Sequence, residues 1–309
     1  MTTQNNLFIS LILTMAIVIA MQSAKAVNYT LPPAGNTLIG YVQTTEAVAT
    51  DTPVGLAQRY NIGLNAIVNA NPGTTELRIV NSNYVKIPTE FLLPNMPHRG
   101  IVINLAEMRM YYYPEGHGNV MTFPIGIGKI GKTIPIRNTS ITRKVVNPTW
   151  TPPADIRQFN REQGIELPKT MAAGPDNPLG PYAIYLSIPT YLIHSTIFPE
   201  SIGRRASFGC IRMNESDIKE FFPLVEKGTP VAIINAPNKV GWDDNKLYLE
   251  AHPALEELND GLQSNLNNMV SLVENAFASK STTFVDWQLA ADILDQPDGV
   301  PHEIGIKIG

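Results

Sequence analysis

Short apolar runs, separated by turn residues, make up most of the chain from residue 100 onward. The stretches "GIVINL", "MRMYYYP" and "VMTFPIGIG" follow one another closely, and "YAIYLS", "YLIHS" and "VAIIN" repeat the pattern further on. Runs of this length that are rich in β-branched and aromatic residues and bounded by Gly, Pro or Asn are typical of strands. The pattern therefore predicts a mainly β domain that opens with a β-meander.

A different pattern marks residues 41–88, where polar and apolar positions follow helical spacing. Thr52 and Pro53 suit the N-cap and first position of a short helix, and a second helix is expected from about Leu64 to Ala70. The strand-like stretches "IGYVQT" and "NYVKIP" lie on either side. The sequence therefore predicts a small α/β module with the order β-α-α-β.

Residues 236–309 are expected to form a C-terminal extension of helix and strand. Apolar residues recur there at three- and four-residue steps, which indicates one amphipathic helix with a packing face. These residues are Leu258, Leu262, Leu266, Met269, Val273 and Phe277. Between the predicted strands of the β domain lies a polar, Pro-rich segment over residues 147–181. Loops this long in a compact domain tend to be functional, so we expect a function for this segment.

The N-terminus carries the apolar run "NLFISLILTMAIVIAM", which is short for a membrane span. The following "QSAKA" places Ala24 and Ala26 in the small-residue pattern of a cleavage site, although no Lys or Arg precedes the run. We therefore predict that residues 1–26 are a signal peptide and that residues 27–40, with Pro and Gly, are a linker. An exported chain is the expectation.

Composition, charge and the absence of known motifs limit the partners and cofactors that can be expected. The net charge is -4 and no long Lys/Arg run occurs, so no nucleic-acid partner is expected. Phosphate-loop, HExxH and paired-cysteine zinc patterns do not occur in the sequence, so neither ATP nor a metal is expected. The single cysteine, Cys210, cannot form an intramolecular disulfide. An unpaired thiol in an exported protein is a liability unless it is buried as a small apolar residue or used.

The residues around Cys210 include groups of the kind that a catalytic cysteine needs. A nucleophilic cysteine needs a base, and His194 precedes it at the end of the strand-like "YLIHS". Gly209 allows a close approach of the backbone to a substrate, and adjacent N–H groups are candidates to bind an oxyanion. Arg212 lies two residues after Cys210, on the same side of an extended chain, where its guanidinium can bind a carboxylate. Each feature alone has a structural alternative, so a structural cysteine and a Cys–His acyl-transfer site both stay open from the residues alone.

The spacing of "IHST" and "SFGCIRM" resembles the signature of the YkuD-type L,D-transpeptidases. Further stretches, "HRGIVINLAEMRMYYYP", "WTPPADIRQFNREQGIELP", "AAGPDNPLGPYAIYLS", "VAIINAPNKVGWDDNKLYLE" and the final "DGVP", are similar to the periplasmic ErfK/YbiS branch. Likewise "DTPVGLAQRYNIGLNAIVNANP" and "VKIP" resemble a LysM domain, which binds the glycan of the bacterial cell wall, although its usual opening is altered here.

The resemblance implies a β-sandwich or barrel catalytic domain over residues 99–235, after a LysM-like domain over 41–88. It implies that Cys210 attacks the carbonyl at position three of a peptidoglycan stem tetrapeptide and releases the terminal D-Ala, with His194 as base. An amine of another stem, or of an outer-membrane lipoprotein, then accepts the acyl group. Ser195 follows the histidine, where the family uses a main-chain carbonyl to orient the imidazole. Ser207 and Gly209 are implied to shape the oxyanion region and Arg212 to contact a carboxylate. No cofactor is implied, and the location is the periplasm.

One residue departs from the family pattern. The signature has a second histidine between Ser and Gly, and this chain has Phe208. Phenylalanine cannot donate a hydrogen bond, and its apolar contact would raise the pKa of a nearby thiol. Three interpretations stay open: a working transpeptidase, a catalytically impaired protein that binds peptidoglycan, and a related L,D-carboxypeptidase or endopeptidase in which water resolves the thioester.

Overall fold

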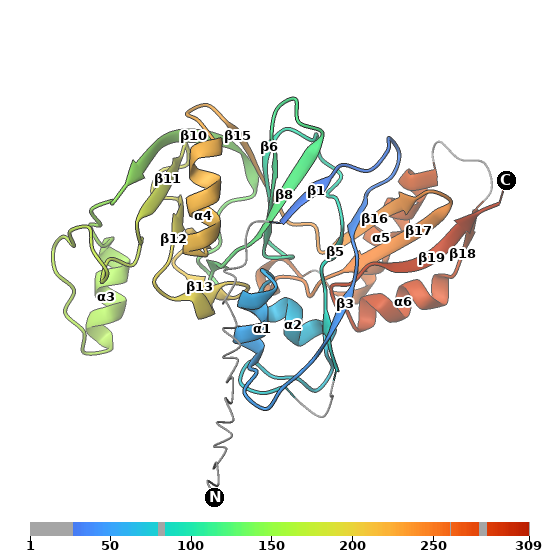
Figure 1. Cartoon of the computed structure of the whole chain (residues 1–309), viewed down its shortest axis with the longest axis horizontal. Helices are drawn as coiled ribbons and strands as arrows, with labels where there is room; N and C mark the ends of the chain where they lie inside the picture. The colour runs from blue at the N-terminus through green and yellow to red at the C-terminus, as the bar shows by residue number, and fades with distance from the viewer. Residues whose placement is uncertain (1–26, 80–83, 260, 278–282, 309) are drawn as a thin grey trace, which may run out of the picture.

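A curled nine-stranded sheet forms the centre of the molecule, as the computed structural model shows for residues 27–79, 84–259, 261–277 and 283–308 (Figure 1). The strand order is β1-β8-β7-β6-β15-β10-β11-β12-β14. The bounds are Val27–Thr30, Asn119–Pro124, Arg109–Tyr113, Gly100–Asn104, Pro230–Ile234, Arg137–Val146, Tyr182–Leu186, Leu192–Ser195 and Ile211–Met213, in that order. The prediction of a mainly β protein is confirmed.

The apolar alternation of these strands builds the main core. Ile103, Phe123 and Ile193 point into one cluster and are fully buried. Helix α4 (Glu215–Phe221) covers this cluster with Ile218 and Phe221, both without exposed surface. Asn214 is the N-cap residue of α4, although its side chain makes no capping hydrogen bond. The short 3₁₀ helix η2 (Phe222–Leu224) continues α4 toward β15.

Residues 27–40 differ from the predicted linker. Strand β1 pairs antiparallel with β8 at one edge of the large sheet. Strand β2 (Leu38–Gly40) pairs with β5 (Glu90–Leu92). The Pro and Gly residues between them make the turn, and the flanking segments supply backbone N–H and C=O groups that the sheet edge can pair. The predicted signal peptide, residues 1–26, lies outside the described residues.

The module over residues 41–88 has the predicted element order, with β3 (Gln43–Glu46), α1 (Pro53–Arg59), α2 (Leu64–Ala70) and β4 (Tyr84–Ile87). Strands β3 and β4 pair antiparallel, and Leu56, Ile67 and Ile87 fill a small separate core. The Thr52 hydroxyl accepts the Gly55 N–H at 3.0 Å, which caps α1. The expected leading strand is divided between β2 and β3.

The C-terminal extension is a second, smaller sheet with helices on it. Its strand order is β16-β17-β19-β18, with bounds Asn238–Asp243, Lys246–Ala251, His302–Lys307 and Thr283–Val285. Helices α5 (Leu262–Phe277) and α6 (Trp287–Asp295) pack here, and Met269 and Val273 are buried against Trp242. The predicted stripe is thus a packing face. Leu258 lies before α5, in the 3₁₀ helix η3 (Glu256–Leu258), and is partly exposed.

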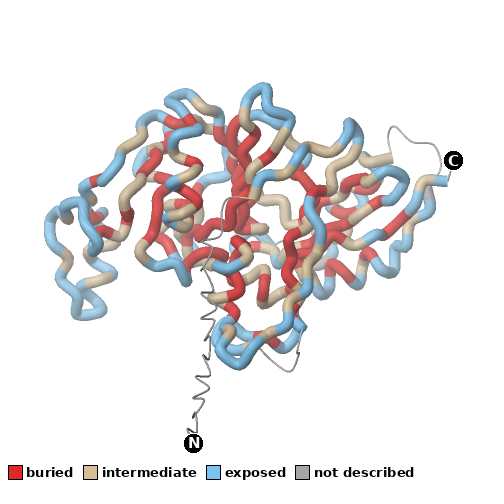
Figure 2. Tube along the Cα trace, viewed as in Figure 1, coloured by how far each residue is buried: buried red, intermediate tan, exposed pale blue. Residues whose placement is uncertain are grey.

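The polar residues 147–181, called the α3 segment below, contain a helix, α3 (Ala154–Glu162), that projects from the side of the large sheet (Figure 1). None of the α3 residues is buried, and Figure 2 shows this helix in exposed and intermediate colours. Trp150 and Met171 form a β-bridge at the base of the segment. Within the described residues, no helix is long and apolar enough to cross a membrane.

Candidate active site

Two neighbouring strands place the predicted catalytic residues. Strand β12 carries His194, and Cys210 directly precedes β14, which runs parallel to β12. His194 is the register partner of Arg212. Register partners in a parallel pair point to the same face, and residues two apart on an extended chain do too. The pairing therefore brings the Cys210, His194 and Arg212 side chains to one face of the sheet.

His194 is oriented by the main chain. Its side chain is buried, and Nδ1 lies 2.5 Å from the Ser195 carbonyl oxygen. A carbonyl only accepts, so Nδ1 carries the proton and Nε2 is left to act as a base. Burial, with a further contribution from the Arg212 guanidinium, lowers the pKa of His194 to about 4, against the opposing effect of the Ser195 and Leu179 carbonyls. The imidazole is thus neutral at neutral pH.

The side chain of Ser195 also supports this arrangement. Its hydroxyl donates to the Leu179 carbonyl at 2.9 Å and accepts the Tyr182 N–H at 3.1 Å. These bonds tie the end of β12 to the end of the α3 segment and to β11. Because Ser195 has no exposed surface, each of its polar atoms needs such a partner. The carbonyl that orients His194 is therefore held in a fixed backbone.

The Cys210 thiol is half-buried. Its Sγ lies 3.7 Å from the Thr190 carbonyl oxygen. Burial raises the pKa of Cys210, while a hydrogen bond from the Leu192 backbone and the charge of Arg212 act in the lowering direction. Among the described residues, no hydrogen bond joins Sγ to the His194 imidazole. A neutral thiol beside a neutral imidazole fits proton transfer during attack rather than a resting ion pair, and catalytic hydrogen bonds often tighten only with substrate.

The turn before Cys210 needs a glycine. Gly209 has φ +116°, and a Cβ there would lie 2.8 Å from Tyr191 Cε1 and 3.0 Å from the Lys132 carbonyl oxygen. Its N–H donates to the Ser207 hydroxyl at 3.0 Å, and that hydroxyl donates to the Cys210 carbonyl at 2.6 Å. Ser207 therefore closes the turn that presents the thiol. In this state the Gly209 N–H is engaged by Ser207.

Arg212 offers a donor to the site. Its Nε is buried, and it has no hydrogen-bond partner among the described residues. The guanidinium lies 5.8 Å from the centre of the Phe198 ring. Burial lowers the pKa of Arg212, against the opposing charges of Cys210 and Glu200. A buried guanidinium donor without an acceptor is costly, so an anionic ligand would satisfy it. The carboxylate contact of Arg212 stays a prediction, and the unpartnered Nε–H is available for it.

Phe208 contacts the α3 segment. Its ring meets Phe159 of α3 edge-to-face, with centroids 5.2 Å apart and planes at 71°. Lys129 Nζ lies 3.8 Å from both ring centroids. Lys129 and Phe159 were not identified from the sequence, because no local pattern joins residues so far apart along the chain. The Phe208 ring therefore packs against another segment of the chain, helix α3.

The loop between His194 and Cys210 doubles back, and the module over residues 41–88 holds it. We call residues 196–204 the supporting loop; it contains the 3₁₀ helix η1 (Pro199–Ser201). The Leu64 N–H at the start of α2 donates to the Ile202 carbonyl at 3.2 Å, and the Asn65 N–H donates to the Gly203 carbonyl at 3.3 Å. Sequence analysis missed this contact, which fixes the chain between His194 and Cys210.

One group of side chains among the described residues has the spacing of a metal site: Glu107, Glu250 and His252. The group lies away from Cys210, between the large sheet and the C-terminal sheet. Lys239 Nζ lies 3.0 Å from Glu107 Oε2 and 2.8 Å from Glu250 Oε1. An ammonium thus occupies the position between the carboxylates that a cation would take, and this cluster is a buried ion-pair network.

Known proteins that resemble this chain are named as L,D-transpeptidases. Residues 98–233 match YkuD, the L,D-transpeptidase catalytic domain. "Probable L,D-transpeptidase YcfS" of Escherichia coli (strain K12) is 39% identical over 290 residues, covering 91% of this chain and 89% of that protein. "Probable L,D-transpeptidase YbiS" of the same strain is 37% identical over 290 residues, covering 93% and 94%. The solved catalytic domain of the E. faecium L,D-transpeptidase is 27% identical, with a TM-score of 0.35, and covers 46% of this chain and 100% of that one.

The two E. coli relatives align with nearly the whole chain, so the likeness extends beyond the catalytic domain to both flanking regions. Identity of this level over this length is reached only by chains of common descent and shared fold. The chain belongs to the YkuD family of L,D-transpeptidases.

Proposed function

We propose that this chain is a periplasmic cysteine L,D-transpeptidase of peptidoglycan, with Cys210 as nucleophile and His194 as general base. The observation that carries the proposal is the His194 hydrogen bond: its Nδ1–H is committed to the Ser195 carbonyl, so Nε2 is free to accept the thiol proton. The shared face of β12 and β14 supports the assignment, because it brings nucleophile, base and Arg212 together.

The proposed reaction proceeds through a thioester. Nε2 of His194 takes the Sγ proton as Sγ bonds to the carbonyl carbon at stem position three. The tetrahedral intermediate then collapses, its bond to the D-Ala nitrogen breaks, and the imidazolium returns the proton to the leaving amine. An acceptor amine attacks the thioester, gives a proton to His194 and restores the thiol. The acyl bond energy is kept throughout, so no ATP is needed.

Substrate binding is assigned to the groups around the thiol. Arg212, with its unpartnered Nε, would bind a carboxylate of the stem peptide. Ser207 and Gly209 hold the turn beside which the carbonyl oxygen of the substrate would become the oxyanion. The module over residues 41–88 is proposed to be a LysM domain that binds the glycan. The acceptor is either a second stem, giving a 3–3 cross-link, or a lysine of an outer-membrane lipoprotein.

A second candidate, a catalytically impaired peptidoglycan-binding protein, is favoured by one observation. Phe208 replaces the motif histidine, and burial raises the pKa of the Cys210 thiol without a second histidine to oppose it. Against it, the Phe208 ring contacts Phe159 and Lys129. The hydrogen bond between His194 Nδ1 and the Ser195 carbonyl is still made beside it. We therefore favour the working enzyme. A hydrolase, in which water resolves the thioester, is the third alternative.

Acylation by a carbapenem tests the proposal, since the E. faecium L,D-transpeptidase catalytic domain has been solved acylated by ertapenem. We expect intact mass to show one adduct on the purified chain and none on Cys210→Ala. No adduct on the wild type, under conditions that acylate Phe208→His, would support the impaired alternative. Product analysis on tetrapeptide muropeptides, with and without added amine, then separates transfer from hydrolysis.

A further inference from the structure

The contact between Phe208 and the α3 segment is built from three side chains of three different segments. Lys129 follows the short strand β9 (Ile127–Gly128), which pairs parallel with β13 (Arg205–Ser207). The Lys129 N–H donates to the Ser207 carbonyl at 2.9 Å. The backbone of Lys129 is therefore fixed to the residue before Phe208, and its side chain can reach the neighbouring ring.

The ammonium of Lys129 lies between two aromatic faces. Its Nζ is 3.8 Å from the centroid of Phe208 and 3.8 Å from that of Phe159. The rings also touch each other edge-to-face. Cations bind the negative face of an aromatic ring, and edge-to-face pairs are favourable in their own right, so the three contacts reinforce one another. We call Phe208, Lys129 and Phe159 the aromatic latch.

The rest of α3 is weakly held. No α3 residue is buried, and Phe159 itself is 41% exposed. Lys132 adds a salt bridge to Asp155 at the start of α3, with Nζ and Oδ2 2.7 Å apart, but both side chains are exposed. Exposed ion pairs of this kind contribute little. The position of α3 beside the nucleophile turn therefore depends mainly on the aromatic latch.

We propose that Lys129 and Phe159 are positioning residues. Phe208, which stands where the family motif has a histidine, is the anchor that holds α3 beside Cys210. This role rests on the proposed function only in that α3 then forms one side of the stem-peptide site. The Phe208 ring holds a neighbouring segment in place and takes no part in proton transfer.

Amide hydrogen exchange on the full chain tests the latch without any turnover. We expect Lys129→Met and Phe159→Leu each to raise exchange in residues 154–162 by roughly three- to tenfold, the range that exposed aromatic and cation–π contacts support. Lys129→Arg should keep the wild-type rate because it retains the cation. The double variant Lys129→Met/Phe159→Leu should exchange about as fast as the faster single variant, since both changes open one contact.

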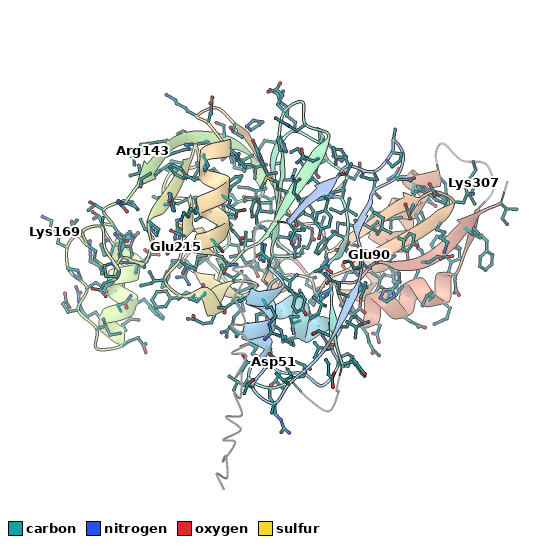
Figure 3. The ribbon with its side chains drawn as sticks, viewed as in Figure 1. Asp51, Glu90, Arg143, Lys169, Glu215 and Lys307 are labelled. Atoms are coloured by element: carbon teal, nitrogen blue, oxygen red, sulfur yellow. The ribbon has the colours of Figure 1, made fainter. Side chains whose placement is uncertain are left out.

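The matched control is Lys169→Met, which removes a lysine from the same segment; Lys169 is exposed at its outer part (Figure 3). Exchange in α3 that stays unchanged in Lys129→Met and Phe159→Leu, or rises equally in Lys169→Met, would overturn the latch. On a tetrapeptide substrate we expect the two latch variants to raise KM with kcat within about twofold, because positioning residues do not touch the reacting atoms. A fall in kcat at unchanged KM would overturn the positioning role. Normal latch exchange in a chain that is never acylated would count against the proposed function alone.

Discussion

The two segments that border the nucleophile turn are held in opposite ways. The supporting loop, which joins the histidine to the cysteine motif, lies against the backbone of α2 and of the large sheet. Ser201, Ile202 and Gly203 are buried, and the Gly203 N–H donates to the Ile125 carbonyl at 3.0 Å. The α3 segment, on the other side, contacts the motif through exposed side chains. Backbone contacts fix one border, and side-chain contacts fix the other.

The close packing of glycines explains the difference. Gly203 has φ +74°, and a Cβ there would lie 2.3 Å from Leu64 N and 2.4 Å from Gly63 Cα. Backbone meets backbone at this point, which leaves no freedom for the loop to move. Nearby, the Asn61 side chain donates to the buried carboxyl group of Asp217 in α4 at 3.0 Å, so the module over residues 41–88 contacts α4 as well as the supporting loop. The comparison teaches that the backbone between His194 and Cys210 is held rigidly, while the adjoining helix α3 can adjust.

The largest effect is expected when His194, the proposed base next to the supporting loop, is replaced. His194→Gln should slow carbapenem acylation by about 10²–10⁴-fold, the usual contribution of a general base. In the wild type, the pKa of about 4 keeps His194 neutral at all higher pH values. The acid limb of the acylation rate should therefore have its midpoint near 4. A midpoint near the ordinary pKa of histidine would show that the imidazole is more solvated than the structure indicates.

The next effect compares two glycines of similar backbone conformation. Gly203 (φ +74°) lies in the supporting loop, and Gly164 (φ +76°), in the α3 segment, has no atom near its absent Cβ. Gly164→Ala should cost about 1–2 kcal/mol of unfolding free energy through backbone strain alone. Gly203→Ala should cost about 2–4 kcal/mol, because a clash with backbone is added to that strain. Urea unfolding measures both, and equal losses would contradict the rigid contact.

A smaller effect concerns the buried carboxylate. Burial raises the pKa of Asp217 to about 7, against the hydrogen bonds from Asn214 and Asn61. The folded chain then holds a proton that the unfolded chain has lost above about pH 4. The stability contributed by protonated Asp217 is therefore complete below that pH and is lost as pH rises through 7, by about 1.4 kcal/mol per pH unit.

Asp217→Asn tests this pH dependence. The difference in unfolding free energy between wild type and variant, measured in urea from pH 4 to 8, should shift against the wild type as pH rises to about 7. His194 acts with the opposite sign, since its lowered pKa makes stability fall as pH drops from about 6.5 to 4. The wild-type curve alone mixes both groups. A difference that is independent of pH would show that Asp217 is ionised in the folded chain throughout.

The smallest effect is expected at the adjustable border. Phe159→Leu should lower the global unfolding free energy by about 1 kcal/mol or less, since Phe159 is 41% exposed and α3 has no buried residue. The same variant should change local exchange in α3 strongly. The urea midpoint measures the global effect. A loss as large as that of Gly203→Ala would mean that α3 belongs to the cooperative core.

Local patterns allowed much of the fold to be predicted. Strand alternation located the β domain, Thr52 and Pro53 located α1, and the apolar stripe located most of α5. The cysteine motif and its spacing to His194 indicated the family, which the comparisons confirm. These signals are readable because periodicity, caps and motif spacing depend on residues close together in the chain. Predicting residues 27–40 as a linker was wrong because strand β1 depends on pairing with β8.

Only the tertiary structure decided what surrounds the motif. The sequence showed that Phe208 departs from the pattern and that it cannot donate a hydrogen bond. The fold brings Lys129 and Phe159 to its ring, and it sets the N-terminus of α2 against the supporting loop. Such contacts join segments that share no local pattern, and they form only when close packing of distant elements leaves one arrangement. The family was therefore readable from the sequence, while the contacts of Phe208 were decided by the fold.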